Sequence, residues 1–305
     1  MMKKITIIIL IFTLFLVSSC NQQEQVDSTA TFIGGTVGLS ADFVTSNPPS
    51  EFKKSSSVPL KILIKNEGES QVATGNAKVK IFSPEPTQLG LSTAFKSNIG
   101  ALMKKDSLTG TGGEQEIDFG KISYKPNVIN QEPLILRARI CYDYMTDTVS
   151  NVCLKSRASS ELNEGVCDIT GQNIVKTGDV SSAPIQVTSI VEQSAADQVN
   201  FAITVQNVGQ GSVFSSSITC ENLENDEQRG NEKDKMLLKI TSPVNAQCDF
   251  KTGNPGKEGI ISLTNNAAII KCWAPVEETV EDKIKISLTY KYRDQITKPV
   301  TVLQG

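Results

Sequence analysis

Two stretches of the chain, 141 residues apart, share one pattern of alternating apolar and polar residues. In 58–64 and again in 199–205, every second residue is apolar. This alternation predicts a β-strand with one buried face, because successive side chains of a strand point to opposite sides. Each stretch runs into an Asn-x-Gly sequence, Asn66-Glu67-Gly68 and Asn207-Val208-Gly209, which favours a tight reversal. The repetition predicts two copies of one β-unit.

The match between the two copies extends beyond these turns. At the same spacing, Ala77 and Val79 are expected to correspond to Ile218 and Cys220. A second matching block, 136–140 with 284–288, has a spacing of 148 residues. The second copy therefore has about seven additional residues between the two blocks, as expected of a loop of variable length.

The second block leads into a pair of tyrosines in each copy, Tyr142 with Tyr144 and Tyr290 with Tyr292. Residues two apart lie on the same face of a strand. Because the pair recurs in both copies, we expect it to belong to the scaffold. The rings would then pack at the edge of a sandwich with their hydroxyls in water.

Short strands separated by turns, in copies of this length, are typical of the immunoglobulin-like β-sandwich. We predict an all-β protein with two immunoglobulin-like β-sandwich domains, at 32–155 and 183–305, joined by a linker at 156–182. Helix is expected to be scarce. The best helical candidate is 91–105, although Gly100 weakens it.

The N-terminal segment predicts export. Two lysines precede an apolar run, 5–17, that is shorter than the roughly 20 residues of a membrane-spanning helix, as in a secretory signal. The run ends in Val17-Ser18-Ser19-Cys20, which resembles the lipobox of bacterial and archaeal lipoproteins. That resemblance implies a signal peptide at 1–19 and acylation of Cys20. The alternatives are an ordinary signal with an incidental cysteine, or an uncleaved anchor.

The residues after Cys20 are polar, so 20–31 is expected to form a flexible tether. The lipid would hold the exported protein at the outer face of the cell membrane. Without Lys3 and Lys4 the chain has 28 basic and 33 acidic residues, a net charge of −5. An acidic chain has no electrostatic attraction for nucleic acid, so we expect no such partner.

The cysteine count fits an exported protein. If Cys20 carries lipid, six cysteines remain, and an even set in an exported chain predicts disulfides. The chain has no histidine and no C-x-x-C sequence, which argues against a metal site or a redox-active thiol. The six are Cys141, Cys153, Cys167, Cys220, Cys248 and Cys272.

A first disulfide is expected between Cys141 and Cys153. In the repeat they align with Thr289 and Thr301, so the second copy lacks both cysteines together. They flank 142–152, which we interpret as a hairpin that a cross-strand bridge could span.

The other four cysteines allow three pairings. Cys248 and Cys272 flank a Gly-rich turn at 252–256 and an apolar strand, which favours a bond between them. Cys167 would then bond to Cys220 and tie the linker to the second domain.

No residue pattern predicts catalysis. The absence of histidine removes the commonest general base and the commonest metal ligand. Asp143 and Asp147 are interpreted as solubilising charges at a sheet edge. The acidic segment 221–235 does not fit a calcium loop and is interpreted as an exposed loop. We expect no catalytic residue, metal or cofactor, and a protein that is not an enzyme.

The strand–turn–strand segments 60–81 and 201–220 resemble the CARDB type of immunoglobulin-like module, the cell-adhesion-related domain of bacteria and archaea. Segment 140–154 also resembles archaeal surface proteins. These resemblances imply extracellular recognition or architecture. The favoured hypothesis is a non-enzymatic cell-surface lipoprotein with a protein partner, acting in adhesion or envelope architecture. The alternatives are a ligand- or carbohydrate-binding subunit of a transporter or enzyme complex, and an unrecognised hydrolase.

Overall fold

The structure is a computed structural model that describes residues 31–157, 166–169, 171, 175–176, 178–243, 245–250 and 253–305. The predicted signal peptide, Cys20 and all but the last residue of the predicted tether lie outside these residues. The described part of the chain is all-β, as predicted, and its strands form three sheets.

Two of the sheets each contain strands of one copy only, and both are antiparallel. The sheet of the first copy has the order β1 (Leu39–Phe43), β3 (Val58–Asn66), β6 (Glu114–Ile122). The sheet of the second copy has the order β12 (Gln247–Asp249), β14 (Ala267–Pro275), β9 (Gln198–Asn207), β8 (Ile185–Ser194).

The third sheet contains strands of both copies. Its path runs β13 (Glu258–Ser262), β11 (Lys235–Ser242), β15 (Val280–Leu303), β7 (Gln131–Leu154), β4 (Ala77–Ser83), β5 (Lys96–Ser97). The short strands β2 (Glu51–Lys53) and β10 (Ser212–Phe214) also pair with β15.

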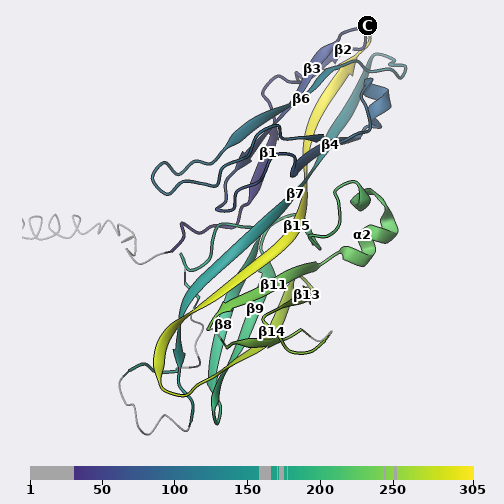
Figure 1. Cartoon of the computed structure of the whole chain (residues 1–305). Helices are drawn as coiled ribbons and strands as arrows, with labels where there is room; N and C mark the ends of the chain where they lie inside the picture. Colours follow the sequence, from purple (N-terminus) through teal and green to yellow (C-terminus); the bar gives the residue numbers. More distant parts are fainter. Residues whose placement is uncertain are drawn as a thin grey trace, which may run out of the picture. The chain divides into compact units, whose positions relative to one another are not determined.

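The strands β7 and β15 join the two copies. Each has 24 residues, and they pair antiparallel from one end to the other. In Figure 1 they run side by side, with the other strands of the first copy around one end and those of the second copy around the other. The two copies therefore share one continuous sheet.

The hairpin expected at 142–152 is wrong, because this segment lies within β7. Every second residue from Tyr142 to Ser150 is buried, so the inward face continues without the interruption that a turn would cause. Both aspartates lie in the part of β7 beyond β4, where β15 is the one strand partner among the described residues and 179–181 meets the other side at an isolated bridge. Asp143 pairs with Lys291, and Asp147 accepts a hydrogen bond from Ser287.

In both copies the sheets pack face to face around the core. Apolar side chains of β3, such as Ile62, belong to the same buried cluster as Val79 of β4 and Ile140 of β7. In the second copy, Ile203 of β9 and Leu238 of β11 belong to this cluster too. The alternating apolar residues of the sequence thus form the inward faces of the sheets.

The structure corrects the repeat after the turn. Ile81 of β4 pairs with Ala138, and Ile240 of β11 pairs with Ile286, at equivalent places in the two copies. The counterpart of β4 is therefore β11, and the expected match of Ala77 and Val79 with Ile218 and Cys220 is wrong. The additional residues of the second copy lie in 208–234, between β9 and β11, which we call the clasp.

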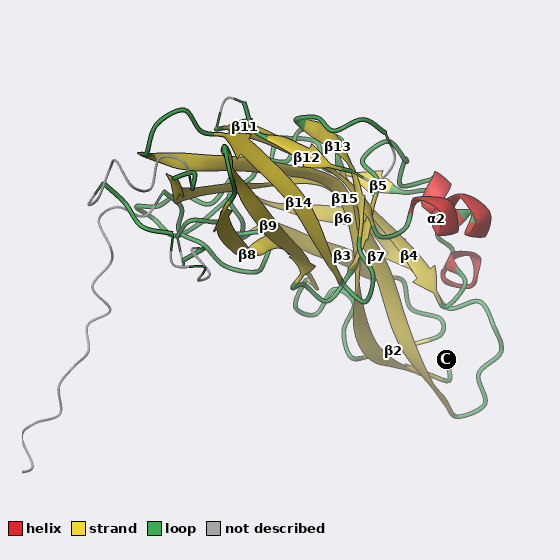
Figure 2. Cartoon of the chain, turned by 90° about the horizontal axis from the view of Figure 1, so that it is seen from below, coloured by secondary structure: helices red, strands yellow, loops and turns green. Residues whose placement is uncertain are grey.

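Helical structure is limited to short segments among the described residues (Figure 2). These are the 3-10 turns η1 (Pro86–Leu89) and η2 (Asn222–Glu224) and the helix α2 (Asp226–Glu232). The helix expected at 91–105 is wrong, since this segment contains β5. The buried Asn98 side chain bonds the backbone of Ala77, Ala73 and Gly100, which replaces the hydrogen bonds of a helix.

Candidate functional site

A tyrosine on the long strand holds the Asn-x-Gly turn in each copy. The Tyr144 hydroxyl donates to Asn66 Oδ1 at 3.1 Å and accepts the Ser70 amide at 3.3 Å. Asn66 Oδ1 also accepts the amide of Gly68. Each turn therefore depends on a side chain of the shared sheet.

The same bonds recur in the second copy. The Tyr292 hydroxyl donates to Asn207 Oδ1 at 3.3 Å and accepts the Gly211 amide at 2.7 Å, and Gly209 donates to Asn207. This identity of contacts supports the internal repeat more strongly than the sequence match alone.

The four tyrosines meet where β7 crosses from one copy to the other. Tyr142 pairs with Tyr292 and Tyr144 with Tyr290 across the β7–β15 ladder, and all four are buried. The expectation of wet hydroxyls at a sandwich edge is wrong. Burial raises the pKa of each hydroxyl, so all four stay protonated and able to donate. This cluster is part of the core and is not a binding site.

The clasp of the second copy is fastened to the first copy. Cys220 forms a disulfide with Cys141 of β7. Beneath the clasp, Phe214, Ile218 and Leu223 form a small apolar cluster with these cysteines on the outer face of the shared sheet. The clasp therefore has a hydrophobic base of its own.

Acidic side chains of the clasp meet basic side chains of the first copy. Glu221 pairs with Lys78 at 2.7 Å, and Glu224 pairs with Lys80 at 2.9 Å and Arg139 at 2.8 Å. Burial raises the pKa of Glu224, but Lys80 and Arg139 together outweigh it and the net shift is downward. Glu221 is exposed, as the interpretation of an exposed loop expects, whereas Glu224 is half-buried, and both glutamates bind basic side chains of the first copy.

The six cysteines form three disulfides, as expected, but only one expected pairing is confirmed. Cys248 and Cys272 face each other on β12 and β14 and are bonded. The pairing of Cys141 with Cys153 is wrong, because 12 residues along one strand place them roughly 40 Å apart. A disulfide needs Cα atoms within about 7 Å. The pairs formed are Cys141–Cys220 and Cys153–Cys167, so Cys167–Cys220 is also wrong.

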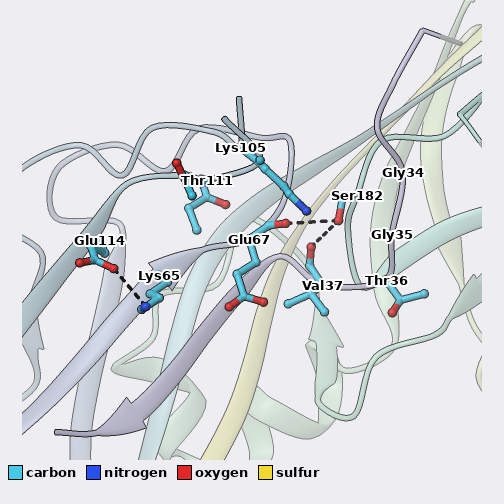
Figure 3. Close-up of a pocket in the computed structure, with 13 residues that line it drawn as sticks. Gly34, Gly35, Thr36, Val37, Lys65, Glu67, Lys105, Thr111, Glu114 and Ser182 are labelled. Atoms are coloured by element: carbon cyan, nitrogen blue, oxygen red, sulfur yellow. Dashed lines mark hydrogen bonds and ion pairs between the residues drawn. The ribbon is translucent and has the colours of Figure 1, made fainter. Parts of the chain in front are cut away.

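A polar cavity of about 330 Å³ lies between the first described residues and the end of β3. It is lined by 34–37, the end of β3 with Glu67, Lys105 and Ser182 (Figure 3). The Ser182 hydroxyl donates to the carbonyl of Val37 at 2.9 Å. Figure 3 shows the Lys105 side chain extending toward Ser182 and Val37. The lining can form hydrogen bonds, but these residues include no paired nucleophile and base.

The connection between β5 and β6, residues 98–113, forms another wall of this cavity and displays apolar side chains. We call it the β5–β6 loop. Leu108 is 94% exposed, Ile99 86% and Met103 57%. Asp106 accepts the amides of Leu108 and Thr109, so the loop is an organised turn. Sequence reasoning missed it as a surface, although Asp106 followed by Gly110 is a turn signal.

Two further features bear on function. Among the described residues, no helix is long and apolar enough to cross a membrane. Within the same residues, acidic, cysteine and histidine side chains do not gather in groups of three or more that could hold a metal ion.

Comparisons with known proteins add little. No family model matches the chain, and no curated protein matches its sequence. A solved structure of the enterococcal surface protein, partial N-terminal region, is 8% identical over 83% of this chain and 87% of that chain, with a TM-score of 0.16. A likeness at this level carries no argument about fold or function.

Proposed function

We propose that the protein is an exported lipoprotein whose two β-units act, without catalysis, as a binding module for a protein partner at the cell surface. The observation that carries the proposal is the β5–β6 loop, which displays three large apolar side chains, one of them, Leu108, on an organised turn. The three disulfides fit an extracellular protein. Acylation of Cys20 would hold the module at the membrane.

The exposure of the β5–β6 loop is significant because the loop is fixed. A mobile loop could turn its apolar side chains inward, but this one is held by Asp106 at its tip and by a β-bridge between Leu102 and Val72. Fixed apolar side chains on a rigid scaffold are typical of binding surfaces. Lys104 and Lys105 in the same loop would favour a partner with an acidic rim.

The resemblance to CARDB-type modules supports the same function. It would make each copy an immunoglobulin-like sandwich, a scaffold that commonly presents loops for recognition. Because the two units share β7 and β15, the first unit would hold its β5–β6 loop in a fixed position relative to the second unit.

The test is photo-cross-linking on intact cells, with a photoreactive residue at position 108. The matched control carries the same residue at position 269, where Ile269 is 64% exposed on β14 of the second copy. We expect position 108 to cross-link to one protein and position 269 to capture none. Equal capture at both positions, or none at either, would show that the loop is not the binding surface.

The anchor has a separate test. Mass spectrometry of the mature chain from membranes should find Cys20 with a diacylglycerol-type modification. An unmodified Cys20 would refute the lipid anchor while leaving the loop as a binding surface.

A second function is favoured by the polar cavity beside the β5–β6 loop. Its backbone and side-chain groups, including Lys105 and Ser182, suit a hydroxylated ligand such as a carbohydrate. A glycan array distinguishes the two functions. Strong glycan binding with no protein cross-link would favour the carbohydrate-binding role.

A further inference from the structure

A second cavity, of about 270 Å³, lies where the clasp meets β7 and β15. Arg139 of β7 and Arg293 of β15 line it, together with Gln210, Ser212 and Gln295. It lies apart from the β5–β6 loop, and nothing in the proposed function accounts for it.

The β7–β15 ladder places both arginines on one face of the shared sheet. Arg139 pairs with Gln295, and Arg293 pairs with Cys141, so the four side chains lie on the same side. This is the outer face, which the clasp covers through the disulfide at Cys141.

Aromatic rings hold both guanidinium groups. Arg139 lies over the ring of Phe82 at 4.1 Å, and Arg293 lies over Phe214 at 5.1 Å from the ring centroid. A stacked guanidinium keeps the N–H groups along its edge available for a planar acceptor. The two arginines are thus positioned in advance of any ligand.

Both arginines have N–H groups that form no hydrogen bond within the described residues. Both bonds from Arg139 to Glu224 come from Nη1, at 2.9 and 2.8 Å. Arg293 donates to the carbonyl of Leu223 at 3.2 Å and, within the described part of the chain, forms no ion pair with a carboxylate. Burial lowers the pKa of Arg293, and repulsion from Arg139 and Arg229 adds to this. A bound anion would relieve that repulsion.

The remaining wall of the cavity is polar, and several of its side chains make no hydrogen bond to the described residues. Among the described residues, the side chains of Gln210, Ser212 and Gln295 have no hydrogen-bond partner. Asp294 adds a carboxylate whose Oδ1 accepts the Gln295 amide at 2.7 Å. Its side chain lies on the opposite face of β15 from Arg293, and its negative charge close to the arginines disfavours a dianion such as phosphate.

From this arrangement we infer that the clasp cavity binds a sugar acid, a ligand with one carboxylate and neighbouring hydroxyls. Arg139 and Arg293 hold the carboxylate. Gln210, Ser212 and Gln295 bind the hydroxyls. The sugar acid is either free or at the end of a glycan, since both present the same groups.

The test is isothermal titration calorimetry on the full mature chain in detergent, with four probes. Glucuronate has both the carboxylate and the neighbouring hydroxyls, and its methyl glycoside imitates the end of a glycan. Glucose lacks the carboxylate, and acetate lacks the hydroxyls. Inorganic phosphate is the dianionic control. We expect glucuronate or its glycoside to bind at least tenfold more tightly than the other three. Tighter binding of the glycoside would identify a glycan end as the source, and tighter binding of free glucuronate a free sugar acid.

Variants of two arginines complete the test. R293Q should weaken glucuronate binding at least tenfold, whereas R137Q, at an exposed arginine of β7 outside the cavity, should leave it unchanged. Melting temperatures of both variants separate a lost ligand contact from a loosened clasp. The inference is overturned if neither glucuronate nor its glycoside binds, if glucose, acetate or phosphate binds equally well, or if the two variants weaken binding equally.

Discussion

The two copies differ most in the connections between equivalent strands. Between β3 and β4 the first copy has ten residues, 67–76, whereas the second has the 27 residues of the clasp between β9 and β11. Between β5 and β6 the first copy has the β5–β6 loop, whereas β13 and β14 are joined by 263–266 alone. Each copy is thus extended at a different place on a common frame.

The features that the two copies share have a different role from the two connections in which they differ. The tyrosine, the Asn-x-Gly turn and the paired long strands are the same in both copies, so they hold the fold. The clasp fastens one copy to the other, and the β5–β6 loop faces solvent. A change in the common frame should therefore cost stability in both copies, whereas a change in either extension should have a local effect.

The largest effect is expected at the clasp disulfide. Replacing Cys141 and Cys220 by alanine opens a loop closed by a sequence separation of 79 residues, against 14 for Cys153 and Cys167. The chain-entropy model gives losses of about 4.5 and about 3 kcal/mol. Urea denaturation of both double variants measures them. A larger loss at Cys153–Cys167 would show that the clasp is not a main fastening.

The turn glycines test the common frame. A Cβ on Gly68 would meet the Tyr144 hydroxyl and lie 2.5 Å from the Ser182 carbonyl oxygen, and one on Gly209 would meet Tyr292 and lie 2.8 Å from Pro184 Cβ. G68A and G209A should each lower the unfolding free energy by roughly 2–3 kcal/mol, as expected of overpacking.

The matched control for these glycines is G230A in the helix α2, where nothing lies within 4 Å of the added Cβ. It should gain up to about 1 kcal/mol, because alanine favours helix over glycine. If only one of G68A and G209A is destabilising in thermal unfolding, the frame is not common to the two copies.

Two glutamates of the second copy should respond to pH in opposite directions. Burial raises the pKa of Glu192 from 4.5 to about 7, against a hydrogen bond from the Cys153 amide that lowers it. Its contribution to stability is complete below pH 4.5 and is lost as the pH rises through about 7. Above pH 7, the unfolding free energy of E192Q should therefore be higher than that of the wild type by on the order of 2 kcal/mol.

Glu224 of the clasp should behave in the reverse sense, because its pKa is lowered in the folded state. Its contribution is present above pH 4.5 and is lost as the pH falls. E224Q should lose about 1–2 kcal/mol at neutral pH and approach the wild type in acid. Unfolding free energies between pH 4 and 8 check both variants, and parallel curves for E192Q and the wild type would contradict the burial of Glu192.

The smallest effect on stability is expected in the β5–β6 loop. Because Leu108 is 94% exposed, L108S should change the unfolding free energy by less than about 0.5 kcal/mol. Partner capture on cells should nevertheless fall at least tenfold. Loss of stability together with capture would mean that Leu108 supports the fold.

The strands and the repeat could be predicted from the sequence because alternation and the Asn-x-Gly turn are local signals. The course of β7 could not. A chain that alternates from Tyr142 to Ser150 looks the same whether it turns or continues, and only the pairing with β15 decides. The burial of Tyr144 and Tyr292 follows from that pairing and was mispredicted for the same reason.

The clasp was beyond sequence reasoning for a different reason. Its contacts with Lys78, Lys80 and Arg139 join residues more than 80 positions apart, and an acidic segment gives no sign of its basic partners. The disulfide from Cys141 to Cys220 depends on the same long-range approach. The pair Cys248–Cys272 was predicted correctly, although the chain between its strands β12 and β14 passes through β13 of the shared sheet.

Native-state hydrogen exchange along β7 tests the central claim, that the two copies are one unit built on a shared strand pair. The amides of β7 that lie beside β4, at 137–142, and those nearer its other end, at 146–152, should exchange with the same opening free energy. If the opening free energies of the two sets differ by more than about 2 kcal/mol, the copies open as separate domains and the claim is contradicted.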